Sequence, residues 1–550
     1  MGAILFFTTL WLGAREEGVE ARAEPATRDP NSACASCHRE IFERYRTTPM
    51  ANASGFALDG FISGDFTHEG SGVHYKLIED GGKVWLTYER DHPSPDRELN
   101  GKQEMRYFIG SGKRGRTYLF EQHGYWFEAP INWYGKKQVW DMTPDFRRAR
   151  SMPLTLPVDP GCLHCHASEV ARSLPEARNL YSGEPFADGG ISCAACHGDG
   201  SVHIASAGKV HMMNIDRLPQ MRRDSICLNC HLEGQTAVIR LGKNTADFVP
   251  GDDLFDFAEY FVYKTENGSG GRATSQWEAL LRSQCKKKSG ERMTCTTCHD
   301  PHDSPRQDVK AEFYRTKCLQ CHDKASFAER HHPENRDCTA CHMARPPSND
   351  IAHEQVTDHW IRKRVSNKTE PMATSGELEP IGETGVDDRE LGLAYAQMAL
   401  RGEDSEAGKR ALNFLKRTEQ KEGGAQKDHE LHANLGFLEQ MAGDADSAEQ
   451  EYKRALEADP YDAIAGGDLA VIKARKREYS EAEKLWQGVF DRDPGQVAAG
   501  IDLAIVECST GRSDAAIATA ERILEFSPDE TKARDMLVAI RSGRQKCGSR

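Results

Sequence analysis

The sequence predicts a mainly α-helical fold with long loops, which contains a small antiparallel β insertion and ends in an all-α solenoid. Three observations predict it. Seven short Cys-x-x-Cys-His motifs are spread over the first two thirds of the 550 residues. Apolar residues alternate in a stretch between the first two motifs, which is typical of strands. The C-terminal third repeats with a period of 34 residues, which is typical of stacked helix pairs.

The seven motifs use 14 of the 17 cysteines, and a histidine directly follows every pair. Cysteine pairs also build zinc sites and redox dithiols, and Cys295/Cys298 with Cys318/Cys321 have the spacing of a zinc ribbon. A zinc site does not need a histidine after each pair, and one dithiol per fold suffices for thiol exchange. The pattern suits covalent haem instead, in which two thiols add to the vinyl groups and the next histidine lies under the iron.

The motifs therefore predict seven covalently bound haems c in a cytochrome domain that spans residues 31–342. This chain is too short to cover each haem separately, so we expect haems to pack against each other and form much of the core. The predicted thioether residues are Cys34, Cys37, Cys162, Cys165, Cys193, Cys196, Cys227, Cys230, Cys295, Cys298, Cys318, Cys321, Cys338 and Cys341. The predicted proximal iron ligands are His38, His166, His197, His231, His299, His322 and His342.

A small antiparallel β subdomain is predicted over residues 61–140, between the first two motifs. Apolar residues alternate on both sides of "EDGG" (79–82), which indicates a β-hairpin, and "MRYFIG", "RTYLFE" and "YWFEAP" continue as a meander. The segment "GSGKRG" (110–115) has glycines like a phosphate-binding loop but lacks its Lys-Ser/Thr ending. We interpret it as a hairpin turn.

The C-terminal domain, 387–543, is predicted to consist of tetratricopeptide repeats. Leu435, Leu469 and Leu503 are spaced by 34 residues, and the same spacing separates three alanines and three prolines. The repeats are placed at 429–462, 463–496 and 497–530, with a degenerate repeat at 387–420 and a capping helix at 531–542. Residues 343–386 are rich in Pro, Gly and polar residues and are predicted to be a linker that includes a ligand-bearing strap.

Residues 1–23 are predicted to be a signal peptide, because "ILFFTTLWLGA" has the length of a signal-peptide apolar region and "ARA" suits cleavage. Covalent haem attachment outside the bacterial cytoplasm agrees with export. The expected location is periplasmic or extracellular, with a soluble or peripheral mature protein. The formal net charge is −14, which argues against nucleic acid as a partner.

Several residues outside the motifs are candidates for the distal iron position. A histidine near a turn that follows or precedes a motif can reach a neighbouring iron, whereas the alternative for each is a solvated side chain. His164 and four histidines of the β insertion, His68, His74, His92 and His123, are weaker candidates, and His429 and His432 are expected at the repeat surface. The candidate distal ligands are His203, His302, His331, His332, His353, His359 and Met50.

Met50 follows the first motif in "CASCHREIFERYRTTPM", and two interpretations stay open. Its thioether sulfur can ligate a haem iron, which raises the potential relative to two histidines. It can also pack against a haem edge, which suits its flexible side chain. Of the three cysteines outside the motifs, Cys508 is expected to be a buried apolar residue and Cys285 a structural thiol; Cys547 is left without an assignment.

The segments "CASCHREIFERYRTTPMANASG", "CHGDGSVH" and "CTTCHDPH" resemble the cytochrome c-554-type and doubled-CxxCH multihaem cytochromes. "YFIGSGKRGRTYLFEQHGYWFEAPINWY", followed by C-terminal repeats, resembles exported bacterial multihaem proteins fused to tetratricopeptide arrays. The resemblance implies electron transfer through closely packed haems, many with two histidine ligands, and it implies His203 and His302 as distal ligands. The chain departs from the family at "TTPM", where c-554-type domains often have Ser-x-His.

Two classes of function are compatible with the sequence. The first is an electron-transfer cytochrome whose repeats dock a redox partner protein or a membrane-associated electron-transport complex. The second is a multihaem oxidoreductase that acts on a small nitrogen or sulfur compound at a haem with an open distal position. No motif shows a lysine in place of its histidine and no catalytic motif is recognisable, so the catalytic residues are unknown and electron transfer is favoured.

Overall fold

The computed structural model describes residues 31–91, 98–264, 275–322, 337–343, 345, 357–363, 373, 375–382, 385–402, 406–422 and 427–548. The predicted signal peptide and the candidates His92, His331, His332 and His353 lie outside these residues. Within the described part of the chain, no helix has the length and apolar character needed to cross a membrane.

Two antiparallel sheets follow the first motif. One sheet has four strands in the order β2 (Gly64–Thr67), β3 (His74–Asp80), β4 (Lys83–Arg90) and β5 (Leu99–Met105). The other contains β1 (Ser54–Phe56), β6 (Tyr107–Ile109), β7 (Gly115–Gln122), β8 (Tyr125–Glu128), β9 (Ile131–Tyr134), β10 (Val139–Met142) and β11 (Leu156–Pro157). The predicted hairpin is β3–β4, in which Asp80 pairs with Lys83 across Gly81 and Gly82, and both glycines have positive φ.

The β region is larger than the sequence predicts, because β1 and β11 lie on either side of 61–140. These strands are only three and two residues long, so they carry no readable alternation. They are strands because β1 pairs with β6 and β11 pairs with β8. The segment 110–115 connects β6 to β7, and the Gly112 amide donates to the Gly115 carbonyl at 3.0 Å, as a hairpin turn requires.

The motifs lie among short helices, as predicted. These are α1 (Ser32–Ala35), α2 (Arg39–Tyr45), α3 (Pro160–His164), α4 (Ala194–His197), α5 (Ser201–Ala205), α6 (Gln220–His231), α7 (Gln276–Arg282), α8 (Gln284–Ser289), α9 (Cys295–Cys298), α10 (Lys310–Leu319) and α12 (Cys338–His342). Two further small sheets are β12 (Ala167–Val170) with β13 (Phe186–Gly189), and β14 (Thr236–Ile239), β15 (Ala258–Tyr263) and β16 (Leu378–Pro380). Strand β16 belongs to the segment expected to be a linker, and it pairs with β15.

The C-terminal helices form pairs as the 34-residue period predicts. They are α13 (Asp388–Arg401), α14 (Ala407–Glu422), α15 (His429–Ala442), α16 (Ala445–Ala458), α17 (Ala463–Arg475), α18 (Tyr479–Arg492), α19 (Val497–Ser509), α20 (Ser513–Phe526) and α21 (Thr531–Arg541). Small residues let neighbouring helices approach closely: a Cβ atom at Gly436 would lie 2.6 Å from Tyr452 of the same pair, and one at Gly500 would lie 2.7 Å from Phe490 of the preceding pair. The three repeat leucines are buried in this solenoid.

Cys508 forms a disulfide with Cys547 at a Cα–Cα distance of 4.5 Å, which the sequence does not predict. The disulfide ties the segment after α21 to the end of α19. Cys508 is also buried, so its assignment to the core holds, whereas its chemistry differs from the prediction. Cys285 is a free thiol of intermediate exposure.

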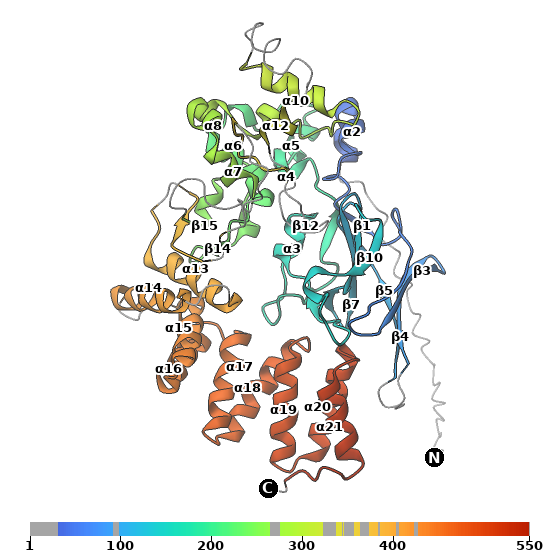
Figure 1. Ribbon diagram of the computed structural model, residues 1–550, viewed down its shortest axis with the longest axis vertical. Helices are drawn as coiled ribbons and strands as arrows, with labels where there is room; N and C mark the ends of the chain where they lie inside the picture. The colour runs from blue at the N-terminus through green and yellow to red at the C-terminus, as the bar shows by residue number, and fades with distance from the viewer. Residues whose placement is uncertain are drawn as a thin grey trace, which may run out of the picture.

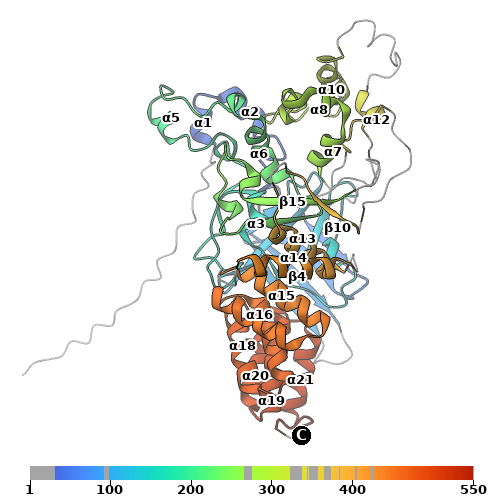
Figure 2. The same ribbon diagram turned by 90° about the vertical axis from the view of Figure 1, so that its left-hand side faces the viewer.

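The solenoid contacts the part of the chain that carries the motifs at both of its ends (Figures 1 and 2). At its C-terminal end Phe526 packs with Tyr125 and Phe127, and Asp529 accepts hydrogen bonds from both terminal nitrogens of Arg90 at 2.9 and 2.5 Å. At its other end α13 packs on the β14–β15–β16 sheet. The repeats are therefore joined to two separate groups of strands.

The stability of the protein should depend on pH through Glu390, a buried carboxyl in the first turn of α13. Burial, together with the neighbouring carboxylate of Asp387, raises the pKa of Glu390 from 4.5 to about 7. The Glu390 carboxyl stays protonated in the folded protein up to about pH 7, but it ionises near pH 4.5 in the unfolded chain. The folded protein is therefore most stable below pH 4.5 and loses stability as the pH rises toward 7. In Glu390→Gln, the free energy of unfolding, measured with urea at a series of pH values, should fall less between pH 4.5 and 7 than it does in the unaltered protein. Parallel pH curves for the two proteins would contradict the prediction.

Candidate haem sites

The motif backbone places the histidine one helical turn after the first cysteine. The amide of His38 donates to the carbonyl of Cys34 at 2.9 Å, and the same bond joins His197 to Cys193 at 2.9 Å and His299 to Cys295 at 3.0 Å. This i to i+4 geometry holds both thiols and the imidazole in fixed relative positions. It is the local geometry that attachment of a haem to a Cys-x-x-Cys-His motif requires.

Three motif histidines face a second histidine from a distant part of the chain. The ring centroids of His38 and His203 lie 6.3 Å apart, those of His197 and His302 lie 6.0 Å apart, and those of His299 and His359 lie 6.1 Å apart. Imidazole nitrogens bind first-row metals at about 2.0–2.1 Å, so two imidazoles on opposite sides of one metal have centroids about 6 Å apart. These three separations fit an iron between the rings.

Several of these imidazoles are oriented by hydrogen bonds from Nδ1. The Nδ1 atom of His203 lies 2.7 Å from the Val210 carbonyl, that of His359 lies 2.8 Å from the Thr357 carbonyl, and that of the motif histidine His342 lies 2.8 Å from the Arg362 carbonyl. A carbonyl partner fixes the protonated nitrogen and makes Nε2 the ligating atom. The Tyr314 hydroxyl lies 3.3 Å from Nδ1 of His299.

Thiols of different motifs lie close to each other. The neighbouring pairs are Cys34 with Cys193, Cys165 with Cys230, Cys227 with Cys295, and Cys318 with Cys338. Cys196 also interacts electrostatically with Cys227, and Cys298 with Cys321. Taken in order, these interactions link motifs one, three, four, five, six and seven, and motif two is linked to motif four.

The surroundings of the motifs fit a large apolar group with ionised carboxylates. Val202, Ile204 and Val210 are exposed by 60%, 49% and 49% around His203, where a porphyrin face would cover them. The Nε atoms of Arg223 and Arg362 are buried and have no hydrogen-bond partner among the described residues. Arg223 lies on α6, which also carries Cys227, and Arg362 follows His359 in the predicted strap. Such unpaired donors suit haem propionates.

Other sequence candidates are engaged elsewhere. The ring nitrogens of His68 lie 2.9 Å from the Ser71 hydroxyl and 3.1 Å from the Arg147 carbonyl. His74 contacts Thr67 and Asp65, and His123 contacts Glu525. Nε2 of His164 accepts from the Asn229 side chain at 2.5 Å. His429 and His432 contact carboxylates in the solenoid, and the buried ring of His432 differs from the surface position that the sequence predicts.

The Met50 carbonyl accepts hydrogen bonds from the amides of Ala53 and Ile191, which ties the segment after α2 to the segment before the third motif. His211, an exposed histidine between α5 and α6, is not among the sequence candidates, and neither are Tyr314, Arg223 and Arg362. The signal for Tyr314 was its position one helical turn before Cys318. The two arginines carry no comparable signal, because only the fold shows that their Nε atoms are buried.

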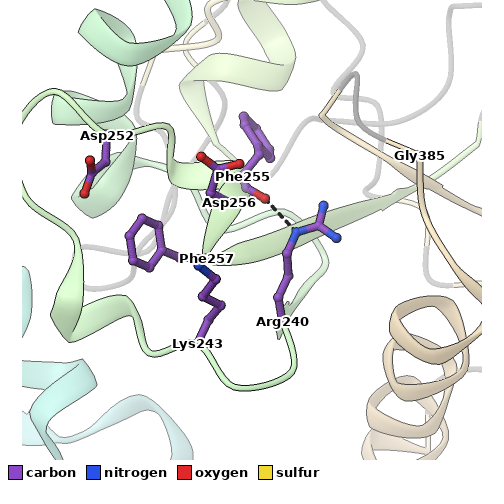
Figure 3. A pocket seen from close by; sticks show the side chains of 7 residues that line it. All are labelled: Arg240, Lys243, Asp252, Phe255, Asp256, Phe257 and Gly385. Carbon is purple, nitrogen blue, oxygen red and sulfur yellow. Dashed lines mark hydrogen bonds between the residues drawn. The ribbon is translucent and has the colours of Figure 1, made fainter.

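A cavity of about 420 Å³ lies beside strands β14 and β15 (Figure 3). Arg240 closes one side and donates from Nε to the Phe255 carbonyl at 2.6 Å. Phe257 and Lys243 lie on the other side, with the Lys243 ammonium 5.5 Å from the centre of the Phe257 ring. The cavity contains no haem-motif residue, so we assign it no part in haem binding.

Comparison with known proteins finds a haem signature around the fifth and sixth motifs. Residues 288–327, which contain the fifth and sixth motifs, match the doubled CXXCH motif family. This motif indicates covalently bound haem c, so the chain has the signature of a multihaem c-type cytochrome. No curated protein sequence matches the chain.

Solved structures that resemble the chain cover its C-terminal repeats. They include MamA from AMB-1 (21% identity, 29% of this chain, 82% of that chain, TM-score 0.25) and MamA 41-end from Desulfovibrio magneticus RS-1 (19%, 29%, 88%, 0.26). A tetratricopeptide repeat protein from Parabacteroides merdae ATCC 43184 is also similar, at 18% identity over 28% of this chain and 61% of that chain, with a TM-score of 0.25. Because these TM-scores are low, the assignment of the repeats depends on the 34-residue period and the paired helices.

Proposed function

We propose that the protein is an exported electron-transfer cytochrome that carries seven haems c, one at each Cys-x-x-Cys-His motif. The observation that supports this best is the series of neighbouring motif thiols, from Cys34 through Cys193, Cys227 and Cys295 to Cys338. Haems attached at neighbouring thiols lie close together, as transfer of electrons from one to the next requires. A bound haem supplies an iron that changes oxidation state without a large structural change.

The chain's own residues hold and orient these groups. The cysteines fix each haem to a helical turn, and the motif histidines supply the proximal ligands. His203, His302 and His359 are proposed as distal ligands to the haems of His38, His197 and His299, because their rings lie at the separation that an intervening iron requires. The carbonyls of Val210 and Thr357 hold two of these rings in a fixed tautomer.

The proposed location is periplasmic or extracellular. Covalent haem attachment and the Cys508–Cys547 disulfide both suit an oxidising compartment. The helix pairs of the solenoid suit protein–protein interaction, and we propose that they dock a redox partner or a membrane-associated electron-transport complex. The contacts of Phe526 and Asp529 with the β sheets occupy part of the solenoid surface, so this docking would use the remaining faces.

One purified sample can test the proposal. Its mass should exceed that of the mature polypeptide by seven covalent haems, and low-temperature EPR of the oxidised protein should show mainly low-spin iron. The reduced protein should then bind carbon monoxide poorly, because filled distal positions exclude it. Fewer haems or free motif thiols would contradict the haem count. Strong carbon monoxide binding at one haem would favour the alternative, an oxidoreductase that acts on a small nitrogen or sulfur compound there.

A further inference from the structure

Residues 282–320 form a cationic region in an acidic protein. The segment contains nine Lys and Arg against five Asp and Glu, whereas the whole chain has a formal net charge of −14. It includes the run Lys286–Lys288 at the end of α8, then Arg292, and Lys310 at the start of α10. Lys287, Lys288, Arg292 and Lys310 are exposed to solvent. We call these four side chains the cationic face.

The cations of this face are not used in ion pairs. Among the residues that the structure describes, no carboxylate pairs with Lys287, Lys288, Arg292 or Lys310 within 4.0 Å. Solenoid lysines behave differently: Lys473 alone lies within 2.6–2.9 Å of carboxylates of Glu449, Glu478 and Glu481. Lys286, the buried member of the run, donates to the Met293 carbonyl at 2.8 Å and holds α8 in place. Its neighbours are therefore presented outward on an anchored helix.

The cationic face lies directly beside two haem motifs. Lys286 of the run bonds to the carbonyl of Met293, two residues before the motif cysteine Cys295. Helix α10 begins at Lys310, carries the motif cysteine Cys318, and places the Tyr314 hydroxyl 3.3 Å from Nδ1 of His299. Cys321, the second cysteine of the sixth motif, is exposed. Figures 1 and 2 place α8 and α10 at the end of the molecule opposite the solenoid. A partner on this face would meet the haems without contacting the repeats.

We propose that the cationic face is an electron-exchange surface for an acidic redox protein, which docks over the fifth and sixth haems. The inference depends on the proposed electron-transfer function and adds a second docking site, for a partner other than the one proposed for the repeats. Unpaired exposed charge attracts a partner of opposite sign and speeds encounter, while the overall negative charge of the chain disfavours docking of an acidic protein elsewhere. The interaction weakens as salt screens the charges.

The test compares the holoprotein with a variant that carries Lys287→Glu, Lys288→Glu and Arg292→Glu. Polyglutamate is the acidic protein probe, and ferricyanide is the anionic oxidant. At low salt the unaltered protein should bind polyglutamate and be oxidised rapidly by ferricyanide. The variant should lose polyglutamate binding, and its fastest oxidation phase should slow by about tenfold or more. Its oxidation by the cationic reagent hexaammineruthenium should not slow.

A matched control carries Lys427→Glu, Lys484→Glu and Lys532→Glu, which change the net charge equally on exposed solenoid residues. It should behave like the unaltered protein with both probes. Variant rates and salt dependence equal to those of the control would overturn the proposal. A shift of haem potentials in the variant, with docking retained, would also overturn it, because the cations would then pair with propionates. Failure of the proposed function is distinguishable, since strong carbon monoxide binding at one haem of the unaltered protein would reveal an open distal position whatever the charge variants do.

Discussion

Replacement of Asp529 by alanine should lower the free energy of unfolding by about 3–5 kcal/mol, the cost of breaking a buried ion pair by removal of one partner. The Asp529 side chain is 2% exposed and that of Arg90 is 18% exposed. Both oxygens of Asp529 accept from Arg90, and one also accepts from the Met152 amide at 2.7 Å. Alanine would remove the carboxylate from a largely buried guanidinium, which keeps its bond to the Ser71 carbonyl, and would remove the acceptor of the Met152 amide. Urea unfolding, followed by helical circular dichroism and by haem absorbance, measures the effect.

A control within the same part of the solenoid is Glu521→Ala, which removes the partner of Arg541 at an exposed ion pair. An exposed pair contributes about 0–1 kcal/mol, so this variant should unfold almost as the unaltered protein does. The effect of Asp529→Ala should also be largest in strands β3, β4 and β7, where hydrogen exchange would quicken. Equal unfolding of the two variants would show that the contact between the solenoid and the sheets is not stabilising.

The solenoid was predictable because its signal is local and repeated. Each repeat places a leucine, an alanine and a proline at the same offsets, and the helices pair as that spacing requires. The ends of the β region were not predictable, since β1 and β11 are strands only through pairing with β6 and β8. The Cys508–Cys547 disulfide was missed for a related reason: its cysteines are 39 residues apart, and sequence alone does not give connectivity.

The motif residues of the candidate site follow from sequence because the chemistry fixes their spacing. Which histidine faces which motif does not follow, since His38 and His203 come from distant segments that the fold brings to a centroid distance of 6.3 Å. The sequence ranks His203 among the candidate distal ligands and His68 among the weaker candidates. The fold separates them, because both ring nitrogens of His68 have partners in the β region whereas His203 lies against a motif histidine.

Replacement of His203 by alanine should convert one haem from low-spin to high-spin and let it bind carbon monoxide. The prediction follows from the position of the His203 ring opposite His38 and from the Val210 carbonyl that fixes its tautomer. Loss of an imidazole ligand also removes stabilisation of ferric iron, so that haem's potential should rise by on the order of 0.1 V within the roughly 0.8 V range that axial ligands set. EPR and a redox titration measure both changes.

Two further variants decide which residue supplies the ligand to that haem. His211→Ala removes an exposed histidine close to His203 in the sequence, and its spectra should match those of the unaltered protein. Met50→Leu tests the thioether: if Met50 packs beside the haem, the substitution should leave the spin state unchanged and shift the potential only slightly. If Met50 is the ligand, Met50→Leu should produce the high-spin haem and abolish a near-infrared methionine-to-iron band, while His203→Ala should leave the spectra unaltered. That pair of results would remove His203 from the distal position.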